Sequence, residues 1–246
     1  MCLKEFLKKI NKSKYFASLE RSYLNVFISE ATLNKACGQG YSIDYSRDLI
    51  LHNCIDVQDA QFIKKTIENK IAFSCIVQKR AHKNQSGSVK FCELVAEITG
   101  KEVELIVPKN TKVFSSKISI KELSGTSDEE RDAAYKSSHY NLLLSLDHSS
   151  KGFFEGFGLT ILEAASFGTP SIVMNTGGLP EAVHHGETEW VINKVTRDEV
   201  ANIFGDVNNS NYFQMAIESH RHVIRSHSLE EYANLLKVIL KQRGVA

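Results

Sequence analysis

The chain has 246 residues, of which 42% are hydrophobic and 24% charged, as is usual for a globular protein with one large core or two smaller ones. Its 30 basic against 29 acidic residues give a net charge of +1, which excludes a general attraction to nucleic acid or anionic lipid. No run of 18 apolar residues occurs, so no membrane-spanning segment is expected.

The first predicted element is an amphipathic helix over residues 3–16, "LKEFLKKINKSKYF". Leu3, Phe6, Leu7 and Ile10 recur at helical spacing with lysines around them. Such a helix either covers the protein's own core or lies on an anionic bilayer. We favour the first interpretation, so that any membrane contact is at most peripheral.

Strands and helices alternate along the rest of the chain. The predicted strands are short runs of β-branched and aliphatic residues, most of them apolar on both faces. They are Leu24–Ile28, Asp48–His52, Phe73–Gln78, Val103–Val107, Tyr140–Leu146, Ser171–Met174 and Glu189–Ile192. This pattern predicts an α/β fold in which helices cover a parallel sheet.

Three capping boxes fix helix starts in the second half of the chain. They are Ser127-x-x-Glu130, Thr196-x-x-Glu199 and Ser228-x-x-Glu231, which place helix starts before Asp128, Arg197 and Leu229. The most plausible connectors are residues 109–116 and 58–71. Because the second of these separates two strand-rich blocks, we expect a domain boundary near residue 60.

The cysteines bear on the redox compartment. Cys2, Cys37, Cys54, Cys75 and Cys92 are odd in number, widely spaced and free of any C-x-x-C pair. This usage suits reduced thiols better than a disulfide framework and suggests no zinc site. The N-terminus also lacks the unbroken apolar core of a signal peptide, so a cytoplasmic location is expected.

The stretch "FFEGFGLTILEAASFGTPSIV", residues 153–173, carries the chemistry. Its charged side chains are Glu155 and Glu163, and a carboxylate in such apolar company needs polar partners. Around them the sequence predicts a strand, a glycine turn at Gly156 and Gly158, and a helix from Leu159 that Gly168 stops. A helix start of this kind offers free N–H groups to an anion such as a diphosphate.

Two carboxylates beside a phosphate are repelled by it unless they bind hydroxyl groups further along the ligand. A sugar nucleotide supplies both ribose and hexose hydroxyls. Dinucleotide and P-loop alternatives are disfavoured, because Gly156-Phe157-Gly158 is followed by Ile161 rather than a third glycine and no Walker A loop occurs. The stretch therefore favours a nucleotide-sugar site.

The same residues resemble the E-x₇-E region of retaining GT-B glycosyltransferases. The match runs through Glu155-Gly-Phe-Gly-Leu-Thr-Ile-Leu-Glu163-Ala, then Gly168-Thr-Pro170, then Gly177-Gly178-Leu-Pro-Glu181. The resemblance implies that Glu155 contacts the transferred sugar and Glu163 the ribose. It implies that the turn Gly156, Phe157 and Gly158, with the amides of Leu159 and Thr160, holds the diphosphate. It further implies no cofactor and no metal, the donor being a UDP-, GDP- or ADP-sugar.

Upstream, "CIVQKRAHKN", residues 75–84, resembles the strand and basic pair that neutralise the donor diphosphate in this family. Arg80 and Lys83 are the cations implied for catalysis. Lys79 stands where the family usually has a glycine, and which of these three residues contacts phosphate stays open.

The resemblance covers roughly residues 20–240 and includes "NVFISEATLNKA" and "LILHNCID". A complete GT-B enzyme has two Rossmann-like domains, each of roughly 150 residues or more. We therefore expect residues 1–60 to be a truncated remnant of the acceptor-side domain and residues 61–246 to be the Rossmann-like donor domain. Its last helix, Leu229–Lys241, is expected to cross back toward the remnant. No histidine of the chain stands in the context of the family's acceptor-side histidine, and His184-His185 and His220-x-His222 fit surface or turn residues better than metal ligands.

The preferred function is a retaining glycosyltransferase of the hexosyltransferase type, acting on a glycan, lipid or protein acceptor. A second subunit or chain, or self-association, is expected to complete the acceptor side. The main alternative is a donor-binding module or fragment with little activity alone. A sugar-nucleotide epimerase or phosphorylase is less favoured, because the further catalytic acids of the first and the cofactor lysine of the second are not identified.

Overall fold

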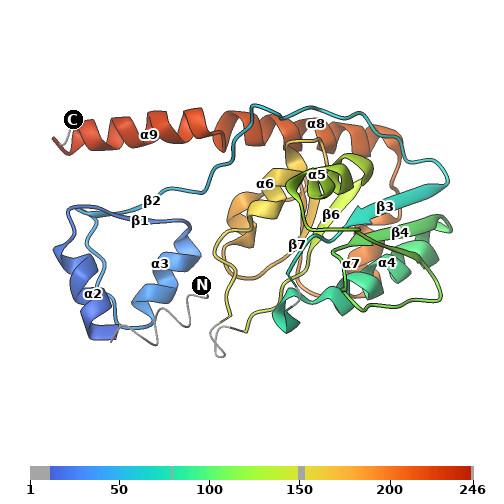
Figure 1. Ribbon diagram of the computed structural model, residues 1–246, viewed down its shortest axis with the longest axis horizontal. Coiled ribbons are helices and arrows are strands. Elements are labelled where there is room, and N and C mark those ends of the chain that lie inside the picture. Colours follow the sequence, from blue (N-terminus) through green and yellow to red (C-terminus); the bar gives the residue numbers. More distant parts are fainter. Residues whose placement is uncertain (1–11, 79, 149–152, 245–246) are drawn as a thin grey trace.

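The computed structural model of the chain describes residues 12–78, 80–148 and 153–244 (Figure 1). Leu3, Phe6, Leu7 and Ile10 of the predicted N-terminal helix lie outside these residues, and helix α2 (Lys12–Arg21) is the first element described. Within the same ranges, no helix combines the length and apolar character needed to cross a bilayer. The four described cysteines are free thiols.

A six-stranded parallel sheet forms the centre of the larger part of the molecule. In spatial order its strands are β5 (Ser119–Glu122), β4 (Glu102–Val107), β3 (Lys70–Ser74), β6 (Tyr140–Leu143), β7 (Ser171–Met174) and β8 (Trp190–Ile192). From β3 the chain first builds outward through β4 and β5, and then returns to place β6 on the other side. In open parallel sheets, ligands bind at the carboxyl ends of the strands where the order reverses, and here that point lies between β3 and β6.

Helices cover both faces of this sheet, which confirms the predicted α/β class (Figure 1). One face carries α4 (Gln85–Thr99) and α7 (Arg197–Phe204), and the other carries α5 (Asp128–Ser137), α6 (Leu159–Ala165) and α8 (Asn209–Ser226). Short 3₁₀ turns are η1 (Ala81–Lys83) and η3 (Leu179–Ala182). Buried aromatic rings of Phe73, Phe91, Tyr140 and Phe204 meet in the core at centroid distances between 5.3 and 6.1 Å.

The predicted strands differ from the observed ones mainly at their ends. β7 matches its prediction, whereas β3 begins at Lys70 and ends at Ser74 instead of spanning Phe73–Gln78. The predicted strand end at Leu144–Leu146 was also wrong, because β6 stops at Leu143. Strand β5 was missed. It is a mostly exposed edge strand, "SIKE", whose charges conceal the apolar pattern of a strand.

The three predicted helix starts are confirmed. Ser127, Thr196 and Ser228 are the N-cap residues of α5, α7 and α9 (Leu229–Gln242). Each hydroxyl accepts a hydrogen bond from the backbone N–H three residues later, which satisfies one of the free donors at a helix start.

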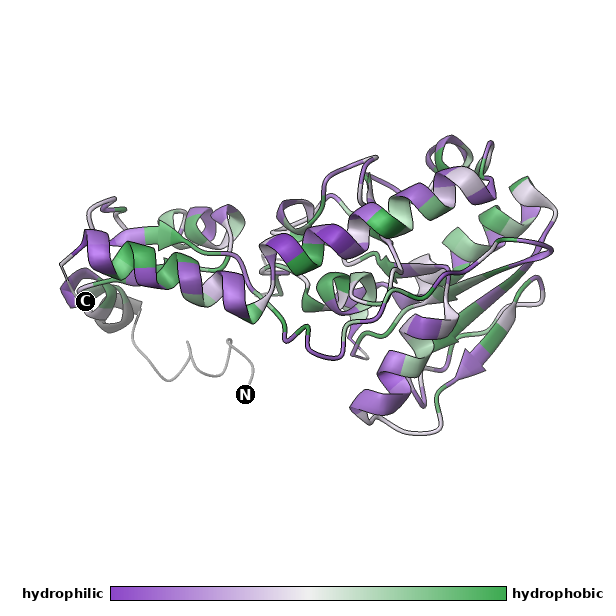
Figure 2. Cartoon of the chain, turned by 90° about the horizontal axis from the view of Figure 1, so that it is seen from above, coloured by the Kyte–Doolittle hydropathy of each residue, from purple (hydrophilic) through white to green (hydrophobic). Residues whose placement is uncertain are grey.

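A second, two-stranded parallel sheet lies beside the six-stranded one (Figure 1). It pairs β1 (Asn25–Phe27) with β2 (Asp48–Ile50) and is flanked by α2 and by α3 (Glu30–Cys37). Helix α9 follows α8 and extends over the two-stranded sheet (Figure 1), and just past its end the backbone oxygen of Arg243 accepts a hydrogen bond from Tyr23. Figure 2 shows apolar and polar residues alternating along α8 and α9, as in amphipathic helices.

The carboxylate of Glu181 joins the part of the chain around the two-stranded sheet to the part around the six-stranded sheet. Its oxygens accept hydrogen bonds from the backbone N–H groups of Glu30 and Ala31, at 2.6 and 2.8 Å, in the first turn of α3. His52 Nε2 lies 3.3 Å from the same carboxylate. An acidic side chain at a helix start satisfies free donors and complements the helix dipole, so Glu181 anchors α3 to the main domain.

We expect Glu181→Ala to loosen this junction. Removing the carboxylate leaves two helix-start donors unpaired, which costs about 1–2 kcal/mol. Amide hydrogen exchange at Glu30 and Ala31 should become faster, whereas the matched exposed variant Glu187→Ala should leave it unchanged. Equal exchange rates in the two variants would show that the contact does not hold α3.

Candidate functional site

Two glycine-rich loops meet at the carboxyl ends of the strands and fix the position of Glu155. The backbone N–H of Gly178 donates to the carbonyl of Glu155 at 2.9 Å. A Cβ on Gly177 would lie 2.3 Å from that carbonyl oxygen, and one on Gly178 would lie 2.0 Å from the oxygen of Gly156. Only glycine permits this approach, so the sequence Gly177-Gly178 sets the place of the Glu155 loop.

The side chain of Glu155 forms an ion pair with Lys83. Lys83 Nζ contacts Oε1 of Glu155, and Ser145 Oγ lies 3.0 Å from the same oxygen. The exposed fractions are 10% for the Glu155 side chain and 19% for that of Lys83, so water screens the pair only partly. The loops after β3 and β6 thus bring together two of the sequence-predicted residues, 72 positions apart.

The other predicted cations are placed differently. Arg80 precedes η1 and is exposed, and no described residue pairs with its guanidinium group. Lys79 lies outside the described residues. Between the cations, His82 is buried and its ring stacks on Phe153 with a centroid distance of 4.7 Å. Burial, and then the charge of Lys83, lower the pKa of His82, so this imidazole is neutral at neutral pH.

Helix α6 starts directly after the Glu155 loop. Gly158 adopts a φ of +93°, and a Cβ there would lie 2.7 Å from Cδ2 of Leu179. Leu159 at the helix start is 43% exposed, and the hydroxyl of Thr160 is buried without a hydrogen-bond partner among the described residues. The strand, glycine turn and helix therefore follow one another as predicted, although α6 ends at Ala165 rather than Phe167.

Phe157 contributes to this turn through its backbone. Its side chain is 1% exposed and packs against the rings of His52 and His227, at centroid distances of 5.0 and 5.5 Å. The ring therefore packs inside the protein and anchors the turn there, so it is not available to contact a ligand at the start of α6.

Glu163 lies one turn into α6 and is held from α5. Tyr135 Oη donates to Glu163 Oε2 at 3.2 Å, and Arg131 Nε lies 3.6 Å from the same oxygen. Burial raises the pKa of Glu163, and the nearby Arg131 and the hydrogen bond from Tyr135 oppose that rise. Sequence reasoning missed Arg131 and Tyr135, because they lie 32 and 28 positions before Glu163. The available signal was their spacing of four residues on one predicted helix.

A cavity of about 390 Å³ lies between the two parts of the chain. Its polar lining includes His52, Glu181, His184, His222 and His227. Burial lowers the pKa of His222 to about 4, with the neighbouring histidines as a smaller cause, and burial also lowers that of His227. Among the residues described, no three His, Cys, Asp or Glu side chains are arranged to hold a metal ion.

Comparison with known families gives a match over most of the main domain. A sequence profile described as "Glycosyl transferases group 1" matches residues 58–224, roughly two thirds of the chain. Shorter stretches are similar to curated proteins. The chain is 35% identical over 91 residues to "Alpha-1,3/1,6-mannosyltransferase ALG2" of Dictyostelium discoideum, covering 36% of this chain and 21% of that protein.

A second relative is "GDP-mannose-dependent alpha-(1-6)-phosphatidylinositol monomannoside mannosyltransferase" of Mycobacterium tuberculosis. It is 40% identical over 53 residues, which cover 22% of this chain and 14% of that protein. The chain thus spans only a minor part of the curated relatives it matches.

Solved structures share the fold at low sequence identity. The Anabaena protein HepE, solved with UDP and glucose, superposes with a TM-score of 0.68 at 13% identity, over 96% of this chain and 68% of that one. A glycosyltransferase from Rickettsia africae gives a TM-score of 0.70 at 15% identity, over 94% of this chain and 66% of that one. TarM gives 0.69 at 11% identity, over 94% of this chain and 45% of that one.

Proposed function

The chain belongs to the family of glycosyl transferases group 1, and from this premise we propose that it binds a nucleotide-diphosphate sugar and transfers the sugar with retention of its anomeric configuration. The fold is that of the GT-B glycosyltransferases, which matches the first expectation from the sequence. The observation that carries the proposal is the Lys83–Glu155 pair beside the glycine turn of α6, at the point where the strand order reverses.

The roles follow from the charges of the reaction. As the bond between the anomeric carbon and the diphosphate breaks, negative charge grows on the leaving phosphate. Lys83 and Arg80, with the backbone N–H groups of Leu159 and Thr160, offset this charge. Glu155 accepts hydrogen bonds from hydroxyls of the transferred sugar, and Lys83 then shares its charge between Glu155 and the diphosphate.

The nucleotide half of the donor lies toward Glu163. An ionised carboxylate accepts hydrogen bonds from two neighbouring hydroxyl groups, which is the pattern that a ribose presents. The relatives support this class of donor, since one of them is named for GDP-mannose and HepE was solved with UDP and glucose. They do not select the base, so UDP-, GDP- and ADP-sugars are all candidate donors.

We propose that polypeptide outside these 246 residues supplies most of the acceptor side, whether in another chain or elsewhere in a longer one. The two-stranded sheet leaves Val26 and Ile50 about 40% exposed, and Leu235 and Val238 of α9 are 41% and 53% exposed. By the register of β1 and β2, Val26 and Ile50 lie on opposite faces of this sheet. Parallel strands are normally covered on both faces, so these partly open faces suit a protein partner. The acceptor itself is a glycan, lipid or protein.

The alternative is a donor-binding module with little activity alone. The same site serves both functions, so the two differ only in whether an acceptor half completes it. A neighbouring reading frame that encodes an acceptor-side domain would favour the transferase. An epimerase is disfavoured, because it needs catalytic acids beyond this motif.

A thermal-shift panel tests the proposal. A ligand that binds only the native state raises the melting temperature, by an amount that grows with its concentration above Kd. We expect at least one of the UDP-, GDP- and ADP-sugars to stabilise the chain, and the matching free sugar to have no effect. No stabilisation by any nucleotide sugar at millimolar concentration would contradict the proposal.

A further inference from the structure

Arg131 and Tyr135 lie one turn apart on α5 and reach the same oxygen of Glu163. The hydrogen bond from Tyr135 Oη measures 3.2 Å and the approach of Arg131 Nε measures 3.6 Å, both to Oε2. Within the described part of the chain, Oε1 of Glu163 has no such partner. One oxygen of the carboxylate is therefore occupied by the protein, while the other remains available.

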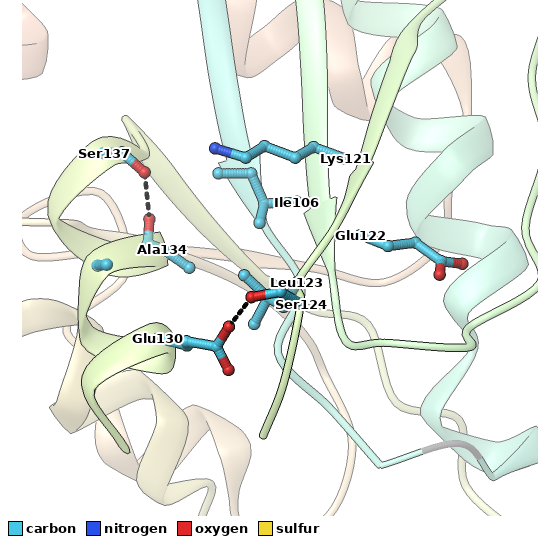
Figure 3. A pocket seen from close by; sticks show the side chains of 9 residues that line it. Ile106, Lys121, Glu122, Leu123, Ser124, Glu130, Ala134 and Ser137 are labelled. Carbon is cyan, nitrogen blue, oxygen red and sulfur yellow. Dashed lines mark hydrogen bonds between the residues drawn. The ribbon is translucent and has the colours of Figure 1, made fainter. Parts of the chain in front are cut away.

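Helix α5 is itself fixed at both ends, so it can hold a side chain in place. At its start the Ser127 hydroxyl accepts a hydrogen bond from the backbone N–H of Glu130. Ser124 donates to the Glu130 carboxylate, as Figure 3 shows, and both residues line a hollow of about 280 Å³. At its end Lys65 Nζ lies 3.2 Å from the backbone oxygen of Tyr135. Tyr135 is fully buried, so close packing holds its ring in place.

The guanidinium group of Arg131 is oriented by two further carboxylates. Its Nη1 lies 2.8 Å from Oδ1 of Asp128, and its Nη2 lies 3.6 Å from Oδ1 of Asp132. The planar group thus has a carboxylate within 4 Å of each nitrogen, and Nε lies 3.6 Å from Glu163 as an ion pair without a hydrogen bond.

We infer that Arg131 and Tyr135 are positioning residues that keep Glu163 ionised and direct its free oxygen toward the ribose hydroxyls of the donor. This inference rests on the proposed function, because it gives Glu163 a ligand. Neither residue touches that ligand, and both act through the carboxylate.

The charges around Glu163 give the inference a distinctive pH dependence. Burial raises the pKa of Glu163, as do Asp132 and Asp128, whereas Arg131 and Tyr135 lower it. Two other titratable groups lie near the end of α6. Lys65 Nζ contacts the backbone oxygen of Phe167, and His220 of α8 contacts the backbone oxygen of Ser166, so neither reaches the Glu163 carboxylate. Without Arg131 the pKa of Glu163 rises further, and protonation removes an acceptor. The affinity for nucleotide should then fall as the pH drops through the raised pKa.

The test is calorimetric titration of UDP, GDP and ADP into the full chain and its variants, at about pH 8 and about pH 5.5. Loss of a hydrogen bond to a charged group costs about tenfold in affinity, so Tyr135→Phe should weaken the best nucleotide by about that factor at the higher pH. The loss should be larger at the lower pH, because the hydrogen bond from Tyr135 also lowers the pKa of Glu163. Arg131→Met should weaken it several-fold more at the lower pH than at the higher one, and Arg131→Lys should restore part of the loss. Tyr212→Phe, a buried tyrosine whose hydroxyl has no described partner, and Arg197→Met, an exposed arginine paired with Glu97, are the matched controls.

The outcomes separate the two proposals. If the parent binds a nucleotide and Glu163→Gln weakens it, while Tyr135→Phe and Arg131→Met bind like their controls, the positioning role is wrong and the proposed site stands. An Arg131→Met loss that is the same at both pH values, with no rescue by lysine, also overturns the positioning role. If the parent binds none of the three nucleotides, both proposals fail. Circular dichroism of each variant confirms that the chain is folded.

Discussion

Lys83→Met should lower the rate of donor cleavage by about a hundred- to a thousandfold, because removing one preorganised stabiliser of leaving-group charge has an effect of that size. Among the residues that the structure describes, the side chains of Lys83 and Ser145 contact the carboxylate of Glu155. Removing Lys83 therefore leaves this largely buried carboxylate without its cation, and the Ser145 hydroxyl remains as its partner. The assay measures release of nucleotide diphosphate from the donor, with water as acceptor when no other acceptor is known. Arg80→Met should have a smaller effect in the same direction.

Lys117→Met is the matched control for this prediction. Lys117 also pairs with a glutamate, Glu97, at 2.7 Å, but it lies on the surface and is 57% exposed. We expect the Lys117→Met variant to cleave the donor at the rate of the parent. If the two lysine variants behave alike, Lys83 has no role in the reaction.

The same assay tests metal independence. When fixed cations and backbone N–H groups offset the leaving-group charge, no divalent ion is needed for that step. We therefore expect the parent rate to be unchanged in excess EDTA. A loss that manganese restores would contradict the mechanism.

Glu163→Ala should weaken nucleotide-sugar binding by about ten- to a hundredfold. The loss of even one hydrogen bond to a charged group costs about 1.5–3 kcal/mol, which is roughly ten- to a hundredfold in affinity. Calorimetric titration with the best donor of the thermal-shift panel measures the change. Glu218→Ala, which removes a partly exposed glutamate paired with Arg221 on α8, should bind like the parent.

Glu163→Ala also leaves the buried Tyr135 hydroxyl without its partner, so some loss of stability is expected. Glu163→Gln keeps a side-chain oxygen for Tyr135 and separates this effect from the loss of binding. Normal affinity in both variants would remove Glu163 from the site.

Local signals in the sequence predicted the elements that depend on neighbouring residues. The N-cap residues Ser127, Thr196 and Ser228 were predicted correctly, because a capping hydroxyl and its backbone N–H lie three residues apart. Strand β7 was also exact, since all four of its residues are buried. Edge strand β5 was missed because its exposed residues carry no burial pattern.

The contacts between distant segments of the site could not be predicted from the sequence. The resemblance indicated Glu155 and Lys83 separately, but nothing in the sequence showed that they would pair directly across 72 positions. The anchoring of α3 by Glu181 depends on a contact across 151 positions, and the support of Glu163 by Arg131 depends on how α5 packs on α6. Such contacts follow from the strand order and from helix packing, which periodicity alone does not determine.

The most direct test of the account is heteronuclear NMR of the chain during titration with the stabilising nucleotide sugar. We expect the largest amide shifts at Gly158, Leu159 and Thr160, with further shifts around Lys83 and Glu163, because the diphosphate and ribose bind there. Shifts confined to the histidine-lined cavity or to other surfaces, with residues 155–163 unchanged, would show that the donor does not bind at this site.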